Sequence, residues 1–146
     1  VREAWRAHGE RDLVEAAGME PGMVVVDHLN EVTVDVVDEA GAWMGFSIYP
    51  DTKMDPDRMV AILQRRGLDR VLVNSAADWG KSDPLRTRAT GEAMLAAGFT
   101  EDDVDRVLWR NPVEFFGQSG RLLLDVPAAD QAATFAGNSL LRGERA

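Results

Sequence analysis

Polar side chains that could take part in chemistry gather directly after three short apolar runs of this sequence. The candidates are, in chain order, Asp27, His28, Glu31, Tyr49, Lys53, Asn74 and Asp78. Each apolar run has the length and composition of a strand buried on both faces of a parallel sheet. In parallel α/β folds, functional residues sit where the strands end. The sequence therefore predicts that these side chains gather at one edge of a sheet.

His28 and Asp78 are the two residues best suited to hold a metal ion. An imidazole at the end of a strand can donate a nitrogen lone pair to a divalent cation. The alternative is a turn histidine that caps a helix beginning near Glu31. A carboxylate at position 78 could bind the same ion and take a proton from bound water. Its alternative is an Asx-turn before Trp79. If the third strand continues, side-chain alternation places Asn74 and Asp78 on one face.

The remaining candidates have an ordinary structural interpretation beside the functional one. Glu31, like Asp27, could orient the imidazole through a hydrogen bond, or it could be a first-turn helix carboxylate. Tyr49 and Lys53 could bind an anionic substrate group, or they could be solvated loop residues. Phe115 and Phe116 are expected in the core, and no Ser-His-Asp or Cys-His set is suggested by the sequence.

The elements that must position these residues alternate between strands and helices. We expect strands at 23–27, 42–49 and 70–74, and helices at 2–17, 31–40, 56–66 and 84–97, followed by short helices after Thr100 and at Asn111-Pro112. Asp55-Pro56 and Asp83-Pro84 each combine an N-cap with a first-turn proline. Val32, Val36 and Val37 form the expected apolar stripe of the second helix. This order predicts βαβ units in either a doubly wound sheet or a barrel, and neither Gly-rich nucleotide fingerprint is present.

Composition narrows the classes of function. The chain has 146 residues, which suggests one domain spanning 1–146, and its formal net charge of −9 argues against nucleic-acid binding. The chain has no cysteine, which excludes thiolate zinc sites and disulfides. No apolar run approaches the roughly 20 residues of a membrane span, and the start lacks the pattern of a signal peptide. We therefore expect a cytoplasmic protein, and the first residues read like a chain entered within a helix.

Taken together, three segments resemble TatD-like metal-dependent hydrolases of the amidohydrolase superfamily. They are Val24–Glu31 (VVVDHLNE), Gly45–Lys53 (GFSIYPDTK) and Val73–Gly80 (VNSAADWG). The likeness is to a branch of predicted TIM-barrel hydrolases encoded beside prenyltransferases. Asn111–Phe116 and Thr134–Ser139 also resemble closing stretches of that branch. The likeness covers most of the chain, from about Gly18 to Gly143, and rests on the order and spacing of motifs that are each modestly specific.

The resemblance implies a partial (β/α)8 barrel, with the three strands as its sixth, seventh and eighth. It implies that His28 is a metal ligand and that an aspartate after the last strand is ligand and general base. The position that many relatives fill with that aspartate corresponds to Ala76 here, so Asp78 would have to serve. The paired histidines, the bridging carboxylate and a further histidine of the family have no counterpart in this chain. A full barrel takes about 250 residues, so three strands cannot close one.

The functional expectation is a hydrolase in which a divalent metal (Zn, Mg or Mn) activates water to attack a phosphoester or amide-like bond of a small-molecule substrate. Alone, such a fragment should bind metal weakly and lack turnover. An N-terminal half-barrel, or self-association through the exposed sheet edges, would complete it. The alternatives are a degenerate, non-enzymatic binding or scaffold module of a biosynthetic operon, which the Ala76 departure favours, and a TatD-type DNase, against which the acidic balance argues.

Overall fold

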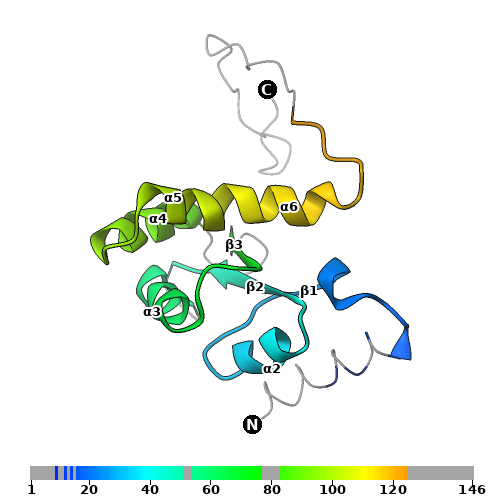
Figure 1. The fold of residues 1–146 in the computed structure, drawn as a ribbon. Coiled ribbons are helices and arrows are strands. Elements are labelled where there is room, and N and C mark those ends of the chain that lie inside the picture. Colours follow the sequence, from blue (N-terminus) through cyan, green and yellow to red (C-terminus); the bar gives the residue numbers. More distant parts are fainter. Residues whose placement is uncertain are drawn as a thin grey trace, which may run out of the picture.

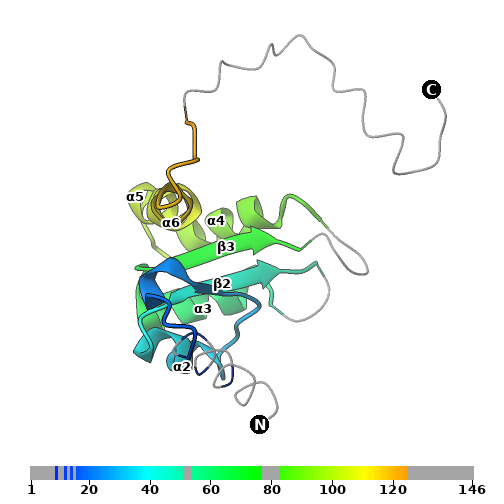
Figure 2. The same ribbon diagram turned by 90° about the vertical axis from the view of Figure 1, so that its right-hand side faces the viewer.

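The protein is an α/β structure built on a three-stranded parallel sheet (Figure 1). The computed structural model describes residues 16–50, 54–76 and 83–124, together with Gly9, Asp12 and Val14. The strands are β1 (Val25–Val26), β2 (Trp43–Ile48) and β3 (Val71–Ser75), and they lie in the order β1-β2-β3. Both pairings are parallel. In Figure 2, β2 and β3 lie side by side and their arrowheads point the same way.

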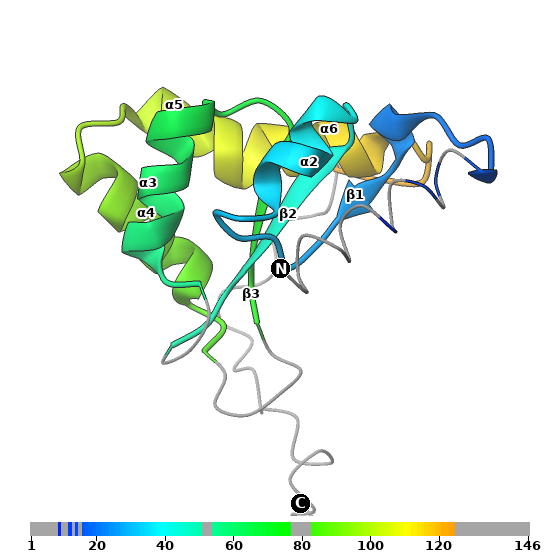
Figure 3. The same cartoon turned by 90° about the horizontal axis from the view of Figure 1, so that it is seen from below.

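The helices alternate with the strands as the sequence predicts. A 3₁₀ turn, η1 (Pro21–Met23), precedes β1, and α2 (Val34–Glu39) and α3 (Pro56–Arg66) follow β1 and β2. After β3 come α4 (Arg86–Ala96) and a continuous run of α5 (Glu101–Asp105), the π-helical η2 (Arg106–Arg110) and α6 (Asn111–Gly117). Figure 3 shows α3 and α4 side by side next to the sheet. Within the described residues, no helix is long and apolar enough to cross a membrane.

The two faces of the sheet have different neighbours. Along β2, Met44, Phe46 and Ile48 belong to the main core cluster, which also contains residues of α2, α3 and α4. The alternate residues Trp43 and Ser47 are also buried but lie outside that cluster. Because side chains alternate along a strand, the sheet has one face that packs on helices and a second face, called here the inner face.

The inner face is covered at the amino ends of the strands. The rings of Trp43 and Phe115 have centroids 5.4 Å apart, and Trp43 Nε1 donates to the Gly22 carbonyl at 3.0 Å. Gln118 Nε2, just after α6, donates to the same carbonyl at 3.1 Å. Therefore α6 and η1 close this end, and the carboxyl ends of the strands form a separate edge.

Three helix starts follow the predicted capping chemistry to different degrees. Asp55 accepts from the backbone N–H of Arg58 at 2.9 Å and starts α3 as expected. Thr100 and Asp103 form a reciprocal capping box at the start of α5. At the third start, Asp83 accepts from the Leu85 N–H and forms a turn, so that regular α4 begins only at Arg86.

The expected helix restart at Asn111-Pro112 is instead a change of winding within one continuous helix. Proline has no N–H to donate to the carbonyl four residues earlier, and its ring crowds that carbonyl. The turn before Pro112 widens, and the Asn111 N–H donates to the carbonyl of Arg106, five residues back. The wide turn carries the fully buried Asn111 side chain inward, where Nδ2 donates to the carbonyls of Leu68 at 2.7 Å and Val71 at 2.8 Å.

Three local predictions were wrong. The first strand has only two residues, because Pro21 starts a 3₁₀ turn in which the Val24 N–H donates to the Pro21 carbonyl. Since α2 begins at Val34, Val32 lies before it and is 59% exposed, and Val34 takes its place in the core. Phe116 is 55% exposed, and its ring meets the half-buried Phe115 edge-on.

Candidate functional site

Four polar side chains meet at the carboxyl ends of the three strands. Asp27 and His28 directly follow β1, Ser47 lies near the end of β2, and Asn74 lies near the end of β3. Ser47 and Asn74 are register partners. The β1–β2 register pairs Val26 with Met44, so Asp27 comes level with Gly45. All four are therefore brought together by the parallel pairing of the sheet.

His28 has a left-handed backbone conformation, with φ of 61°. A residue with a side chain adopts this conformation at a cost of about 1–2 kcal/mol, and histidine is among the residues enriched there. The cost is offset locally, because the His28 N–H donates to Asp27 Oδ1 at 2.8 Å. The turned backbone directs the exposed imidazole toward β2 rather than toward the start of α2.

The imidazole is held by a buried hydroxyl. Ser47 Oγ lies 2.7 Å from His28 Nδ1, and the Ser47 side chain is only 3% exposed. At this distance one of the two atoms donates a hydrogen bond to the other. The histidine ring is thereby oriented through Nδ1, and Nε2 lies on the far side of the ring from Ser47.

The Asp27 carboxylate lies at the centre of the cluster. Ser47 Oγ is 3.5 Å from Asp27 Oδ1, and Asn74 Nδ2 is 3.4 Å from Oδ1 and 3.3 Å from Oδ2. A Cβ on Gly45 would lie 2.6 Å from Oδ1 and 2.9 Å from the Asp27 Cα. Only glycine lets Asp27 pass this close to β2, so Gly45 is part of what shapes the site.

This cluster contains the residue types of a catalytic triad but not its connectivity. In a triad the imidazole lies between the carboxylate and the hydroxyl. Here the side chain of Ser47 lies between the imidazole of His28 and the carboxylate of Asp27. Ser47 is also buried. The geometry therefore describes an anchored histidine and not an activated serine nucleophile.

The other predicted site residues separate into three groups. Asn74 joins the cluster, while its expected shared face with Asp78 falls outside the described residues. Glu31 does not reach His28: its two carboxylate oxygens accept from Arg58 Nε at 2.8 Å and Nη2 at 2.6 Å. That hydrogen bond from Arg58 lowers the pKa of the Glu31 carboxyl. Lys53 and Asp78 lie outside the described residues.

The structure also contradicts the non-functional interpretations of Tyr49 as a solvated loop residue and of His28 as a helix cap. Tyr49 is 3% exposed and its N–H donates to the Met54 carbonyl, so it is not a solvated loop residue. His28 does not cap a helix, because Asn30 provides that turn. The carbonyl of Asn30 accepts from the Thr33 and Val34 N–H groups, and its Oδ1 accepts from the Val32 N–H.

Comparisons with known proteins give no relative from which to assign the site. No family model, curated protein or solved structure matches this chain. Within the described residues, no group of three or more His, Cys, Asp or Glu side chains is placed to hold a metal ion. At the carboxyl edge, Nε2 of the exposed His28 is the ring nitrogen that Ser47 does not contact, and the Asp27 carboxylate lies on the Ser47 side of the ring.

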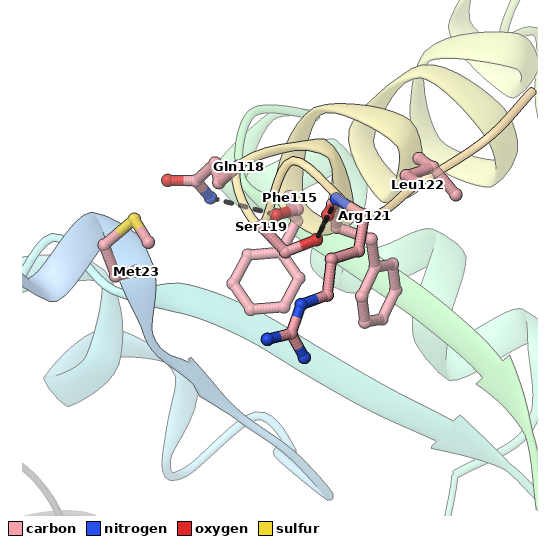
Figure 4. A pocket seen from close by; sticks show the side chains of 7 residues that line it. Met23, Phe115, Gln118, Ser119, Arg121 and Leu122 are labelled. Carbon is pink, nitrogen blue, oxygen red and sulfur yellow. Dashed lines mark hydrogen bonds between the residues drawn. The ribbon is translucent and has the colours of Figure 1, made fainter.

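A pocket lies at the opposite, amino end of the strands (Figure 4). Met23 of η1 lies on one side of it, and residues of α6 and the following segment lie on the other. Its volume is about 430 Å³, and its lining residues are Met23, Phe115, Phe116, Gln118, Ser119, Arg121 and Leu122. This lining has neither a carboxylate nor an imidazole.

Ser47 is the functional candidate that the sequence did not single out. It sits inside an apolar strand and reads there as a small buried residue. The available signal was its spacing: it lies two residues after Gly45, on the same face of the strand that precedes Tyr49. Recognising it requires the register of the sheet, which the sequence alone does not supply.

Proposed function

We propose that this chain is part of a metal-dependent hydrolase in which His28 binds a divalent cation through Nε2. The observation that carries the proposal is the 2.7 Å contact between His28 Nδ1 and Ser47 Oγ. Metal-binding histidines almost always engage their other ring nitrogen in a hydrogen bond, which fixes the ring and the tautomer. An exposed imidazole anchored in this way at the carboxyl edge of a parallel sheet is prepared for a ligand.

The donor set fits a hard or borderline cation but does not complete its shell. The Nε2 nitrogen of His28 suits Zn²⁺ or Mn²⁺, whereas Mg²⁺ prefers carboxylate oxygens. A catalytic zinc usually takes three protein ligands. We propose Asp78 as a further ligand or general base, with the remaining ligands supplied by polypeptide beyond this chain.

The same proposal assigns the sheet to a (β/α)8 barrel, as its last three strand–helix units. Three features support it. The strand order is sequential, the helix-covered face is strictly the alternate face of β2, and the polar cluster lies at the carboxyl ends of the strands. In barrels of this kind the inner face points to the axis, and function is found at the carboxyl end.

A bound cation would supply a polarised water with a lowered pKa, ready to attack a phosphoester or amide-like bond. The contribution of this chain is positional. Ser47 orients the imidazole, Asp27 fixes the backbone turn that presents it, and Asn74 donates to Asp27. None of these three contacts requires the substrate, so the edge is organised before substrate binds.

Metal binding by the whole chain tests the proposal. Titration of Zn²⁺ and, separately, Mn²⁺ into the wild-type protein by calorimetry should give weak, one-site binding. His28→Ala should weaken it by roughly tenfold or more. The matched control is His8→Ala, which removes the other of the two histidines and should leave the affinity unchanged.

Two results would count against the proposal. Equal loss in both histidine variants would mean nonspecific binding, and no uptake at all by the wild-type chain would leave His28 without a metal. Hydrolysis is measured next with bis(p-nitrophenyl) phosphate and Mn²⁺. The expected result is no turnover by the chain alone and metal-dependent turnover after a native N-terminal half is restored. Absence of turnover in the restored protein would favour the non-enzymatic binding module.

A further inference from the structure

The chain of hydrogen bonds behind His28 carries information about where the imidazole proton lies. Four atoms are joined in sequence: His28 Nδ1, Ser47 Oγ, Asp27 Oδ1 and, donating to Asp27, Asn74 Nδ2. A serine hydroxyl has a single proton to donate. The direction of this one proton therefore decides which nitrogen of the neutral imidazole is protonated.

We infer that the neutral imidazole of His28 carries its proton on Nδ1 even without metal, and that Ser47 and Asp27 are the residues that keep it there. In this arrangement Nδ1–H donates to Ser47 Oγ, and the Ser47 hydroxyl donates to Asp27 Oδ1. Nε2 keeps its lone pair. In the opposite arrangement, Ser47 would donate to Nδ1 and Nε2 would be protonated, unable to bind a cation until the ring changed tautomer.

The charge and burial around Ser47 favour the first arrangement. The Asp27 carboxylate is the only negatively charged neighbour of Ser47 among the hydrogen bonds of the described residues, and hydrogen bonds to an ionised acceptor are roughly twice as strong as neutral ones. Ser47 is 3% exposed, so water does not compete for its proton. The Ser47–Asp27 separation of 3.5 Å is long, and Asp27 itself is exposed, so the preference rests on the charge of the carboxylate and on the burial of Ser47.

The carboxylate is itself held facing Ser47. The His28 N–H donates to Oδ1 at 2.8 Å, and Asn74 Nδ2 reaches both oxygens. Gly45 leaves the space in which Oδ1 sits. Asp27 therefore cannot turn away from Ser47 without breaking its bond to the backbone of His28. The hydrogen-bonded series His28–Ser47–Asp27, called here the relay, is thus fixed by the folded edge of the sheet.

The first experiment observes the tautomer directly in the metal-free protein. His8→Ala leaves His28 as the only imidazole, so long-range ¹⁵N–¹H correlation spectra, recorded well above the pKa of an ordinary imidazole, report on one ring. The expected pattern is protonated Nδ1 and unprotonated Nε2. A pattern of protonated Nε2 would overturn the inference, and this result needs no variant of the relay itself.

The second experiment assigns the cause, in the same His8→Ala background. Ser47→Ala should shift the ring toward protonated Nε2 or a mixture, and Ser47→Thr, which keeps the hydroxyl, should restore protonated Nδ1. Asp27→Asn, which removes the charge, should also release the tautomer. If the Ser47→Ala ring stayed wholly protonated on Nδ1, Ser47 would not be its positioning residue.

The expected effect on Zn²⁺ affinity rests on the proposed function. The measurements distinguish failure of the proposed metal site from failure of the tautomer inference. Ser47→Ala should bind Zn²⁺ about 10-fold more weakly than the wild type, within the range typical for loss of a hydrogen-bond partner behind a metal-binding histidine. Protonated Nδ1 without any Zn²⁺ uptake would remove the metal site and leave the relay. Zn²⁺ uptake at His28, with Nε2 protonated in the metal-free ring, would overturn the tautomer inference and keep the metal site.

Discussion

Gly45→Ala is the substitution that tests most sharply how the site is built. The added Cβ would lie 2.6 Å from Asp27 Oδ1 and 2.9 Å from the Asp27 Cα, whereas ordinary van der Waals separations begin at 3.4 Å. The carboxylate must retreat by about 0.8 Å and the backbone by about 0.5 Å to reach that distance. The backbone shift also strains the bond from the Leu29 N–H to the Gly45 carbonyl, now 3.0 Å.

The expected cost follows from two opposing terms. Overpacking a filled site costs about 1–3 kcal/mol, and replacing a strand glycine returns about 0.5–1 kcal/mol of backbone entropy. We therefore expect the free energy of unfolding of Gly45→Ala to fall by about 1–2 kcal/mol, and the melting temperature by roughly 2–8 °C. Urea denaturation measures the first and calorimetry the second.

A matched control and a double mutant separate the mechanism from a general effect of alanine. Gly117 ends α6 with open space around its Cβ position, so Gly117→Ala should leave stability unchanged or raise it by up to about 1 kcal/mol. Asp27→Ala removes Oδ1 but leaves the clash between the new methyl group and the backbone of residue 27. The double mutant should therefore recover part of the loss, with a coupling energy of about 0.5–1 kcal/mol.

The outcome that would refute this reasoning is specific. Gly45→Ala as stable as the wild type, with an unchanged His28 imidazole spectrum, would mean that Asp27 does not pass over β2 at Gly45. The placement of the whole cluster would then be wrong. Strict additivity of Gly45→Ala and Asp27→Ala would mean that the clash is with the backbone alone.

Three further predictions concern the supports of the sheet. Asn111→Ala should lower the free energy of unfolding by about 2–4 kcal/mol in urea, because it leaves the buried Val71 carbonyl and the part-buried Leu68 carbonyl without their donor. An effect below about 1 kcal/mol would contradict these contacts. Thr100→Ala should cost about 1 kcal/mol, and Thr100→Ser should cost much less, because the capping hydroxyl accepts from the Asp103 N–H at 3.1 Å. The backbone N–H and then the hydroxyl of Thr100 lower the pKa of Asp103. A group whose pKa is lowered on folding stabilises the fold above its unfolded value, and that stability is lost as the pH falls through the folded value. Asp103→Asn should therefore lose less stability than the wild type between about pH 7 and pH 3 in urea titrations, and parallel titrations of the two would contradict this.

Helix caps and buried strands could be predicted from the sequence, because both depend on residues that are neighbours along the chain. Asp55 starts its helix where predicted, because an aspartate before a first-turn proline satisfies the exposed N–H groups without help from the rest of the fold. The run from Trp43 to Ile48 is a strand buried on both faces, as its continuous apolar character indicates. Counting in twos predicted that Asn74 shares a face with Asp78, which lies outside the described residues.

What the sequence could not supply were contacts that depend on register or on a competing element. Glu31 was expected either as a first-turn helix carboxylate or as an orienter of His28, but it precedes α2 and binds Arg58, 27 residues later. Phe115 and Phe116 are equally apolar neighbours, but only Phe115 meets Trp43, while Phe116 is exposed. Ser47 acquires a role only when β1 lies beside it.

The register of β1 against β2 therefore determines whether the polar cluster forms at this edge of the sheet. With Val26 opposite Met44, Asp27 meets a glycine and Ser47 reaches the imidazole. A slip of one residue would set Asp27 against Met44 or Phe46, whose side chains belong to the helix-covered core, and would turn the hydroxyl of Ser47 away from His28. Gly45 opposes that slip, because it is the β2 position at which the absence of a Cβ leaves room for Asp27. The glycine that lets the strands approach thus also selects the register in which the polar cluster forms.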